Sequence, residues 1–250
     1  MINIAHAVSN YDKVDGDSSG KEILVTKWYK RTGGWLYLIK CHDRCMAALA
    51  AKYAELIAND DKYGYSSESG SGGRWSGFNS IKSLRANGLS VEEAIKRGRG
   101  NFDCSSFCLT CYILAGLNHK ASGYTGSMVT SLKETGLFDI YEGGNQVASD
   151  DFAEIGALYL MPKAHVAMAL ETGSMIANEP VDNPEDSTSY AEALGSVRIR
   201  KTPKTGKTVD ILKKGQKAEI VSVDSDTGWL YVKHNGNVGY LTNNARYVKL

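Results

Sequence analysis

Five cysteines are the residues of this chain best suited to covalent chemistry, and they fall in two short segments. Cys104, Cys108 and Cys111 follow helical spacing and would line one face of a helix. Cys41 and Cys45 stand one helical turn apart in the other segment. An odd set crowded in this way does not suit a disulfide scaffold, so a free thiol, a metal ligand or a nucleophile remains.

Cys104 is the cysteine best placed to act as a nucleophile. Asp103 can cap a helix over the apolar run that follows it, which puts Cys104 in the first turn and a stop at Gly116. The helix dipole at this end favours a thiolate, and free backbone N–H groups there can hold an oxyanion. The alternative is a buried structural cysteine, since free cysteines are often buried.

A thiol nucleophile needs an imidazole to take its proton. Of the five histidines, His165 begins an otherwise apolar strand, which is where a fixed base would sit. His6, His119 and His234 are expected to face solvent, and His42 adjoins the other cysteine group. His165 is therefore the predicted base.

A polar third residue usually orients the imidazole. A turn centred on residues 172–173 would pair Ala167 with Asn178, so that Asn178 becomes the diagonal neighbour of His165 on one face of a hairpin. A register shift of one residue would put Glu179 there instead. Asn178 is the predicted orienting residue, with Glu179 left open.

Zinc is the alternative use of the cysteines. Structural zinc sites generally combine closely spaced cysteine pairs or cysteine and histidine sets. A C-x₃-C pattern on one helix offers fewer tetrahedral geometries, and burial of Cys108 and Cys111 requires no metal. We expect no metal and no other cofactor.

The elements that would position these residues predict an α+β fold. Helical periodicity covers His42–Asn59, a capping box opens a helix at Ser90–Glu93, and a further helix is expected at about Ser127–Thr135. With a loop at 66–78, the first hundred residues are expected to be mostly helical. Helices followed by antiparallel hairpins indicate this fold class. The expected strands are Ala157–Met161, His165–Leu170 and Met175–Asn178.

A change of composition near residue 190 predicts a domain boundary. Residues 1–196 hold 18 Lys and Arg against 24 Asp and Glu, a net charge of −6, whereas residues 197–250 hold 11 against 4, a net charge of +7. The polar segment 183–196 is typical of a linker and leaves residues 1–182 as the first domain. Short Val-, Ile- and Tyr-rich runs separated by turn residues predict a small all-β barrel after it.

Motifs of the first domain resemble NlpC-type papain-like cell-wall peptidases. Asp103-Cys-Ser-Ser-Phe107 is similar to the D-C-S-G-hydrophobic box of that family. Gly156-Ala-Leu-Tyr-Leu and His165-Val-Ala-Met-Ala are similar to its G-D-L and H-V-G-I-Y strands. Gly16-Asp-Ser-Ser-Gly-Lys-Glu-Ile and Lys62-Tyr-Gly-Tyr65 resemble segments of phage endolysins that carry this domain. The resemblance implies a papain-like fold whose cysteine attacks a peptide carbonyl of peptidoglycan, typically beside D-glutamate.

The resemblance also implies roles for residues. Cys104 takes the place of the nucleophile and His165 that of the base, while Asp103 and Ser105 of the box are expected to contact substrate. Tyr65 is the expected equivalent of a tyrosine near the oxyanion, with Tyr63 or a plain loop aromatic as the alternative.

Three positions depart from the family pattern. Ser106 stands where the box usually has Gly, and Ala157 stands where the strand has Asp. The third polar residue would fall at Ala177 by the commonest spacing, so it is moved to Asn178. These departures leave the third residue and the bond cleaved open.

The last segment resembles bacterial SH3-like domains, which in peptidoglycan hydrolases usually bind cell wall. The net positive charge, together with Trp229 and Tyr240 as aromatic contact residues, suits such a surface, although Trp229 and Tyr240 could instead pack in the barrel core. No nucleic-acid motif accompanies the charge. The similar segments are Val197-Arg-Ile-Arg200, Gly228-Trp-Leu-Tyr-Val232, Gly236-Asn-Val-Gly-Tyr-Leu241 and Tyr247-Val248.

The sequence thus predicts a two-domain, endolysin-like cysteine endopeptidase that acts on bacterial peptidoglycan as a monomer and causes cell-wall lysis. An N-acetylmuramoyl-L-alanine amidase on the same fold and a non-catalytic wall-binding protein remain as alternatives. Neither a signal peptide nor a run of about 18 apolar residues is found, so no membrane insertion is expected. The expected location is the host cytoplasm until lysis, and then the cell wall.

Overall fold

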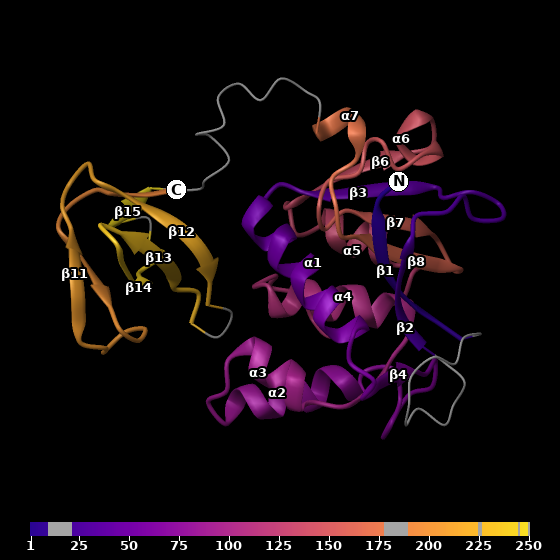
Figure 1. The fold of residues 1–250 in the computed structure, drawn as a ribbon, viewed down its shortest axis with the longest axis horizontal. Coiled ribbons are helices and arrows are strands. Elements are labelled where there is room, and N and C mark those ends of the chain that lie inside the picture. The colour runs from indigo at the N-terminus through magenta and orange to yellow at the C-terminus, as the bar shows by residue number, and fades with distance from the viewer. Residues whose placement is uncertain (10–21, 178–189, 225–226, 245, 250) are drawn as a thin grey trace. The chain divides into compact units, whose positions relative to one another are not determined.

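The computed structural model describes residues 1–9, 22–177, 190–224, 227–244 and 246–249 (Figure 1). These residues form two compact units, the first mainly from residues 1–179 and the second mainly from residues 180–250. Each unit has its own sheet.

The first unit is built on an eight-stranded mixed sheet. Neighbouring strands pair antiparallel except β4 and β5, which are parallel. The strand order is β5 (Gly100–Phe102), β4 (Tyr63–Tyr65), β2 (Glu22–Lys27), β1 (Asn3–Val8), β8 (His165–Ala169), β7 (Leu158–Met161), β3 (Tyr37–Cys41) and β6 (Phe138–Glu142).

At the centre of this sheet, the first strand of the unit, β1, pairs with its last strand, β8. Strand β1 pairs with β2 on one side and with β8 on the other, where Ile4 stands opposite Ala169. If that register continues along the strands, His6 faces Ala167 and is the diagonal neighbour of His165 on the same face. The N-terminal strand therefore lies directly beside the strand of the predicted base.

Two helices pack against the central strands of the sheet (Figure 1). Helix α4 is buried along almost its whole length, which explains why its sequence has no polar face, and α1 packs beside it. The helices of the unit are α1 (Arg44–Ala58), α2 (Ser76–Ala86), α3 (Val91–Arg97), α4 (Cys104–Leu114), α5 (Met128–Lys133), α6 (Asn145–Ala148) and α7 (Ser174–Ala177).

Helix starts follow the capping pattern of the sequence. Oδ1 of Asp103 accepts a hydrogen bond from the backbone N–H of Ser106 at 2.6 Å, which confirms Asp103 as the cap of α4. The predicted capping box is also confirmed, because Ser90 and Glu93 bond each other's backbone N–H groups at the start of α3.

Two sequence predictions for this unit are wrong. The first hundred residues are not mostly helical, because β1, β2 and β3 form within them. Central strands are covered on both faces, so they lack the polar and apolar alternation that marks a half-exposed strand. The predicted strand Met175–Asn178 is also not formed, since α7 occupies Ser174–Ala177. Its backbone bonds Asp151 and Gly173 instead of β8.

The second unit is a seven-stranded antiparallel sheet around an apolar core. Five of its strands coincide with the predicted runs, while β11 was not predicted and β9 lies inside the segment expected to be a linker. The α+β class of the first unit and the all-β class of the second are therefore confirmed. The strand order is β11 (Thr208–Leu212), β10 (Val197–Arg200), β14 (Asn237–Leu241), β13 (Leu230–His234), β12 (Lys217–Val223), β9 (Tyr190–Ala193) and β15 (Val248–Lys249).

Candidate active site

Cys104 is the first residue of α4, and 8% of it is exposed. Backbone hydrogen bonds of Ser105 and Val166 act on its thiol. Val166 follows His165 directly on β8, so the sulfur lies within one residue of the predicted base along that strand. The structure thus brings the start of α4 and the start of β8 together.

His165 hydrogen-bonds a second imidazole. The Nε2 atom of His165 lies 2.8 Å from Nδ1 of His6, and Nε2 of His6 lies 3.2 Å from Oγ1 of Thr26. These three side chains come from the adjacent strands β8, β1 and β2. His6 is only 3% exposed, so the expectation that it faces solvent is wrong.

Asn178 and its alternative Glu179 lie outside the described residues. The hairpin that would have placed Asn178 beside His165 is absent, because α7 forms there. His6 now stands in the diagonal relation to His165 that was expected of Asn178, on the strand at the other side of β8. The sequence feature that could have identified His6 is its position as a polar residue within an apolar N-terminal segment. Hydrophobic periodicity did not predict a strand there.

Aromatic rings enclose the two imidazoles. The indole of Trp35 stacks on His165 with ring centroids 5.9 Å apart, and the ring of Tyr29 lies 5.8 Å from that of His6. The indole Nε1 of Trp35 donates to the backbone oxygen of Tyr29 at 3.0 Å, which fixes the two aromatics to each other. This arrangement restricts rotation of the two imidazole rings.

Burial decides the protonation of the site. It lowers the pKa of His165 to about 3, helped by the positive charges of His6 and Arg31, and it lowers the pKa of His6 to about 4. Burial also raises the pKa of Cys104 to about 11, and the negative charge of Asp103 adds to that effect. Desolvation therefore opposes the thiolate that the helix terminus favours. Burial favours the uncharged forms of the thiol and of both imidazoles.

Asp103 and Ser105, both expected to contact substrate, take part in an internal network. The Oγ atom of Ser105 donates to Oδ1 of Asp103 at 3.0 Å, and Nε of Arg74 lies 3.0 Å from Oδ2 of the same carboxylate. Nη2 of Arg74 donates to Ser105 at 2.9 Å and to the backbone oxygen of Gly123. Arg74 was not identified from the sequence, where nothing distinguishes it within its glycine- and serine-rich loop.

Tyr65 and Tyr63 occupy different environments on β4. Tyr65 is half-buried, and its pKa is raised by burial and then by the charges of Cys104 and Asp103. Tyr63 is fully buried, and its hydroxyl donates to the backbone oxygen of Ile95 at 2.7 Å. Of the two tyrosines, Tyr65 is therefore the one whose charge interacts with that of Cys104.

Two of the remaining cysteines share α4 with Cys104. Cys108 and Cys111 are fully buried in α4, and burial raises the pKa of both thiols well above its usual range. All five cysteines are free. Within the described ranges, no group of three or more His, Cys, Asp and Glu side chains could hold a metal ion.

The aromatic residues expected to contact the cell wall lie outside the core cluster of the second unit. Trp229 and Tyr240 are both half-buried. The ring of Tyr240 lies 5.0 Å from that of Tyr231 on the neighbouring strand. His234, expected at the surface, is only 8% exposed, so that expectation is wrong.

Comparison with known proteins adds one match. The family model of an endolysin-like domain matches residues 10–176, which is more than half of the chain and includes Cys104 and His165. No curated protein matches the chain. In the part of the chain that the structure describes, no helix is long and apolar enough to cross a membrane.

Proposed function

The chain belongs to the endolysin-like domain family, and from that premise we propose that it is a peptidoglycan hydrolase that cleaves a stem-peptide amide bond with Cys104 as nucleophile. The observation that carries this proposal is the thiol at a buried helix start beside β8, whose His165 is hydrogen-bonded to His6 of the neighbouring β1. A site of this composition suits acyl transfer. The NlpC type of the catalytic unit and the SH3-like type of the second unit belong to this proposal.

The hydrogen bonds of the histidine pair support His165 as the general base. For its Nδ1 to accept the thiol proton, the proton of neutral His165 must be on Nε2, which then donates to Nδ1 of His6. His6 in turn carries its proton on Nε2 and donates it to Thr26. A neutral pair thus has one arrangement in which every hydrogen bond is made and Nδ1 of His165 is free to accept.

In the reaction, the sulfur of Cys104 attacks the amide carbonyl carbon as its proton passes to His165. The resulting imidazolium protonates the leaving amine, the carbon–nitrogen bond breaks, and a thioester remains. Water then attacks the thioester, with His165 accepting a water proton and returning it to the sulfur. Backbone N–H groups at the start of α4, together with Tyr65, are the proposed donors to the oxyanion.

His6 replaces Asn178 as the proposed orienting residue. It acts through His165 and does not touch the substrate, so it is a positioning residue. Its neutral form accepts the Nε2 proton of His165 both before and after proton transfer, which holds the ring with Nδ1 toward the reacting atoms.

The second unit is the proposed cell-wall anchor. Its excess of basic residues provides attraction to an anionic wall, and the half-buried Trp229, Tyr231 and Tyr240 provide contact area. This division gives one unit the chemistry and the other the attachment.

Replacing the nucleophile tests the proposal. We expect Cys104→Ala to lower the rate of wall lysis by at least about 10³-fold, while Cys45→Ala, at a partly exposed cysteine of α1, leaves it unchanged. Mass spectrometry of the released fragments separates a stem endopeptidase from an N-acetylmuramoyl-L-alanine amidase by the new termini. Full lysis by Cys104→Ala, or absence of any lysis by the unsubstituted chain, would contradict the proposal.

A further inference from the structure

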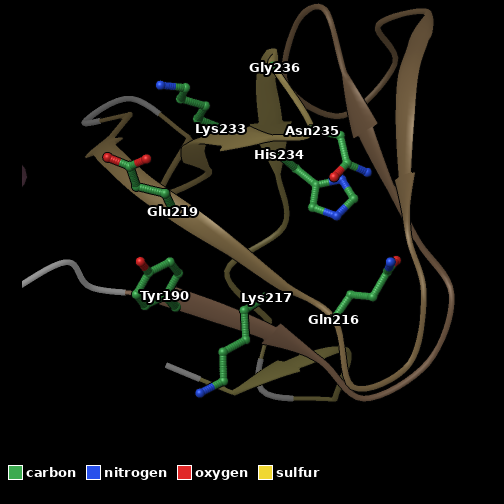
Figure 2. A pocket seen from close by; sticks show the side chains of 8 residues that line it. All are labelled: Tyr190, Gln216, Lys217, Glu219, Lys233, His234, Asn235 and Gly236. Carbon is green, nitrogen blue, oxygen red and sulfur yellow. The ribbon is translucent and has the colours of Figure 1, made fainter. Parts of the chain in front are cut away.

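A shallow, open cavity of about 390 Å³ lies on the surface of the second unit. Figure 2 shows it beside strands β9, β12 and β13 and the turn that follows β13. Its size falls within the range of small-ligand sites in proteins. The lining residues are Tyr190, Gln216, Lys217, Glu219, Lys233, His234, Asn235 and Gly236.

Strand register explains why charged residues of both signs meet here. Glu219 of β12 stands opposite Tyr190 of β9 and opposite Lys233 of β13. Lys217 precedes Glu219 by two residues and therefore shares its face of the sheet. In Figure 2, Glu219 and Tyr190 lie between the two lysines.

These charges are available to a ligand. Among the described residues, Lys217, Lys233 and Glu219 form no ion pair, and both lysine side chains are exposed. The cavity thus presents two separated cations and one carboxylate to the same space.

A buried histidine closes the other side of the cavity. Nδ1 of His234 lies 2.9 Å from Oδ2 of Asp210, and Asn237 bonds the same oxygen at 3.4 Å. Because an ionised carboxylate only accepts, the Nδ1 atom of His234 carries a proton. His234 is only 8% exposed and directly follows Lys233 on β13, so its ring lies on the other side of the strand from the charged side chains and shapes the cavity without facing them.

The mixture of charges defines the ligand. A polyphosphate or another polyanion would meet the carboxylate of Glu219 between the two lysines, which disfavours it. A short peptide offers a carboxylate to Lys217 or Lys233 and an ammonium to Glu219. Gln216 and Asn235 supply further amide groups, and Tyr190 supplies an apolar wall.

We infer that this cavity binds a short peptide that carries both a free carboxylate and a free ammonium group. The identification of that peptide as a peptidoglycan stem rests on the proposed function. The second unit then recognises the peptide part of the wall through this cavity, and charge alone does not account for its attachment.

Calorimetric titration of the full chain carrying Cys104→Ala tests the inference without cleavage. The probes are the tripeptide γ-D-glutamyl-L-lysyl-D-alanine, the same peptide with its carboxylates amidated, the same peptide with its amines acetylated, and poly(glycerol phosphate). We expect binding of the free peptide alone, with each modification weakening it by about tenfold, which corresponds to about 1.4 kcal/mol.

Single substitutions at exposed positions assign the contacts. Lys217→Gln and Lys233→Gln are expected to weaken binding of the free peptide by about tenfold but not to alter binding of the amidated one. Glu219→Gln is expected to weaken binding only of peptides with free amines. Lys214→Gln, an exposed lysine outside the cavity, is the matched control.

Two outcomes would overturn the inference: equal binding by Lys214→Gln and both cavity lysine variants, or tighter binding of poly(glycerol phosphate) than of the peptide. Wall lysis by the unsubstituted chain is measured separately. Peptide binding without lysis would contradict the proposed hydrolase function but not the cavity assignment. Lysis without peptide binding would contradict the cavity assignment but not the hydrolase function.

Discussion

At the scale of single residues, burial favours the uncharged forms of the groups in the candidate site. Desolvation raises the pKa of Cys104 and lowers that of His165, so in the proposed reaction the proton moves as the thiol attacks. A base with a lowered pKa remains unprotonated in mildly acidic solution. The imidazole of His6 and the guanidinium of Arg31 both act on the imidazole of His165, and the effect of each can be tested by substitution.

Removal of the His6 side chain is expected to impair turnover more than binding. His6→Ala should lower kcat by about 10²-fold with KM little changed, because the base loses the acceptor that orients it. His6→Gln, whose side-chain oxygen can accept from Nε2 of His165, should recover part of that loss. Steady-state kinetics on a soluble stem peptide, with melting temperatures as the check on folding, measure both. Equal kcat in the two variants would contradict an orienting role.

Arg31 is expected to control the acid side of the pH profile. Its positive charge lowers the pKa of His165, so Arg31→Gln should raise that pKa and shift the acid limb of kcat/KM to higher pH. Lys30→Gln, the adjacent exposed cation, is the control and should leave the limb in place. NMR titration of the imidazole gives an independent measurement, and an unchanged or lowered pKa in Arg31→Gln would refute the assignment.

At the scale of elements, short-range sequence patterns predicted the helix start and the strand start that carry the two main candidate residues. Cys104 and His165 were identified because a helix cap and a strand start are written in neighbouring residues. The partnership of His6 with His165 joins residues 159 positions apart, and it depends on β1 entering the sheet between β2 and β8. The diagonal geometry proposed for the third residue reappears on β1, but no periodicity in the sequence identifies which strand lies on that side of β8.

The turn before β7 provides a test of element packing. Gly156 has a φ of +82°, and a Cβ there would lie 2.5 Å from the backbone oxygen of Ala47 in α1. Gly136 has a φ of +71° with nothing within 4 Å of an added Cβ, so it shares the backbone strain without the clash. We expect Gly156→Ala to lower the free energy of unfolding by about 1–3 kcal/mol more than Gly136→Ala does. Urea unfolding measures the free energy of unfolding of both variants. Equal losses of stability would contradict the expected clash with α1.

At the scale of the whole molecule, the near-neutral net charge is the sum of an acidic first part and a basic second part. The second part carries the excess of basic residues, and its cavity contains a carboxylate between two lysines. As proposed, general attraction to the wall and recognition of one peptide are separate properties of this unit, and we expect them to depend differently on salt.

Salt is expected to distinguish these two contributions. Binding of the full chain carrying Cys104→Ala to purified walls should weaken as NaCl rises from about 0.05 to about 0.5 M, because exposed charges are screened over shorter distances. Sedimentation of the walls measures the bound fraction. Salt-insensitive binding would place recognition in the aromatic and hydrogen-bonding contacts alone.

The position of β1 between β2 and β8 also has a consequence for the order of events during synthesis. The hairpin of β1 and β2 can form early, but β8 is translated more than 130 residues after the end of β2. Until then His6 has no imidazole partner, and a growing chain with Cys104 already in its helix still lacks the proposed base. The histidine pair therefore forms only when β8 joins the sheet, so a nascent or truncated chain that ends before β8 has the proposed nucleophile without its proposed base.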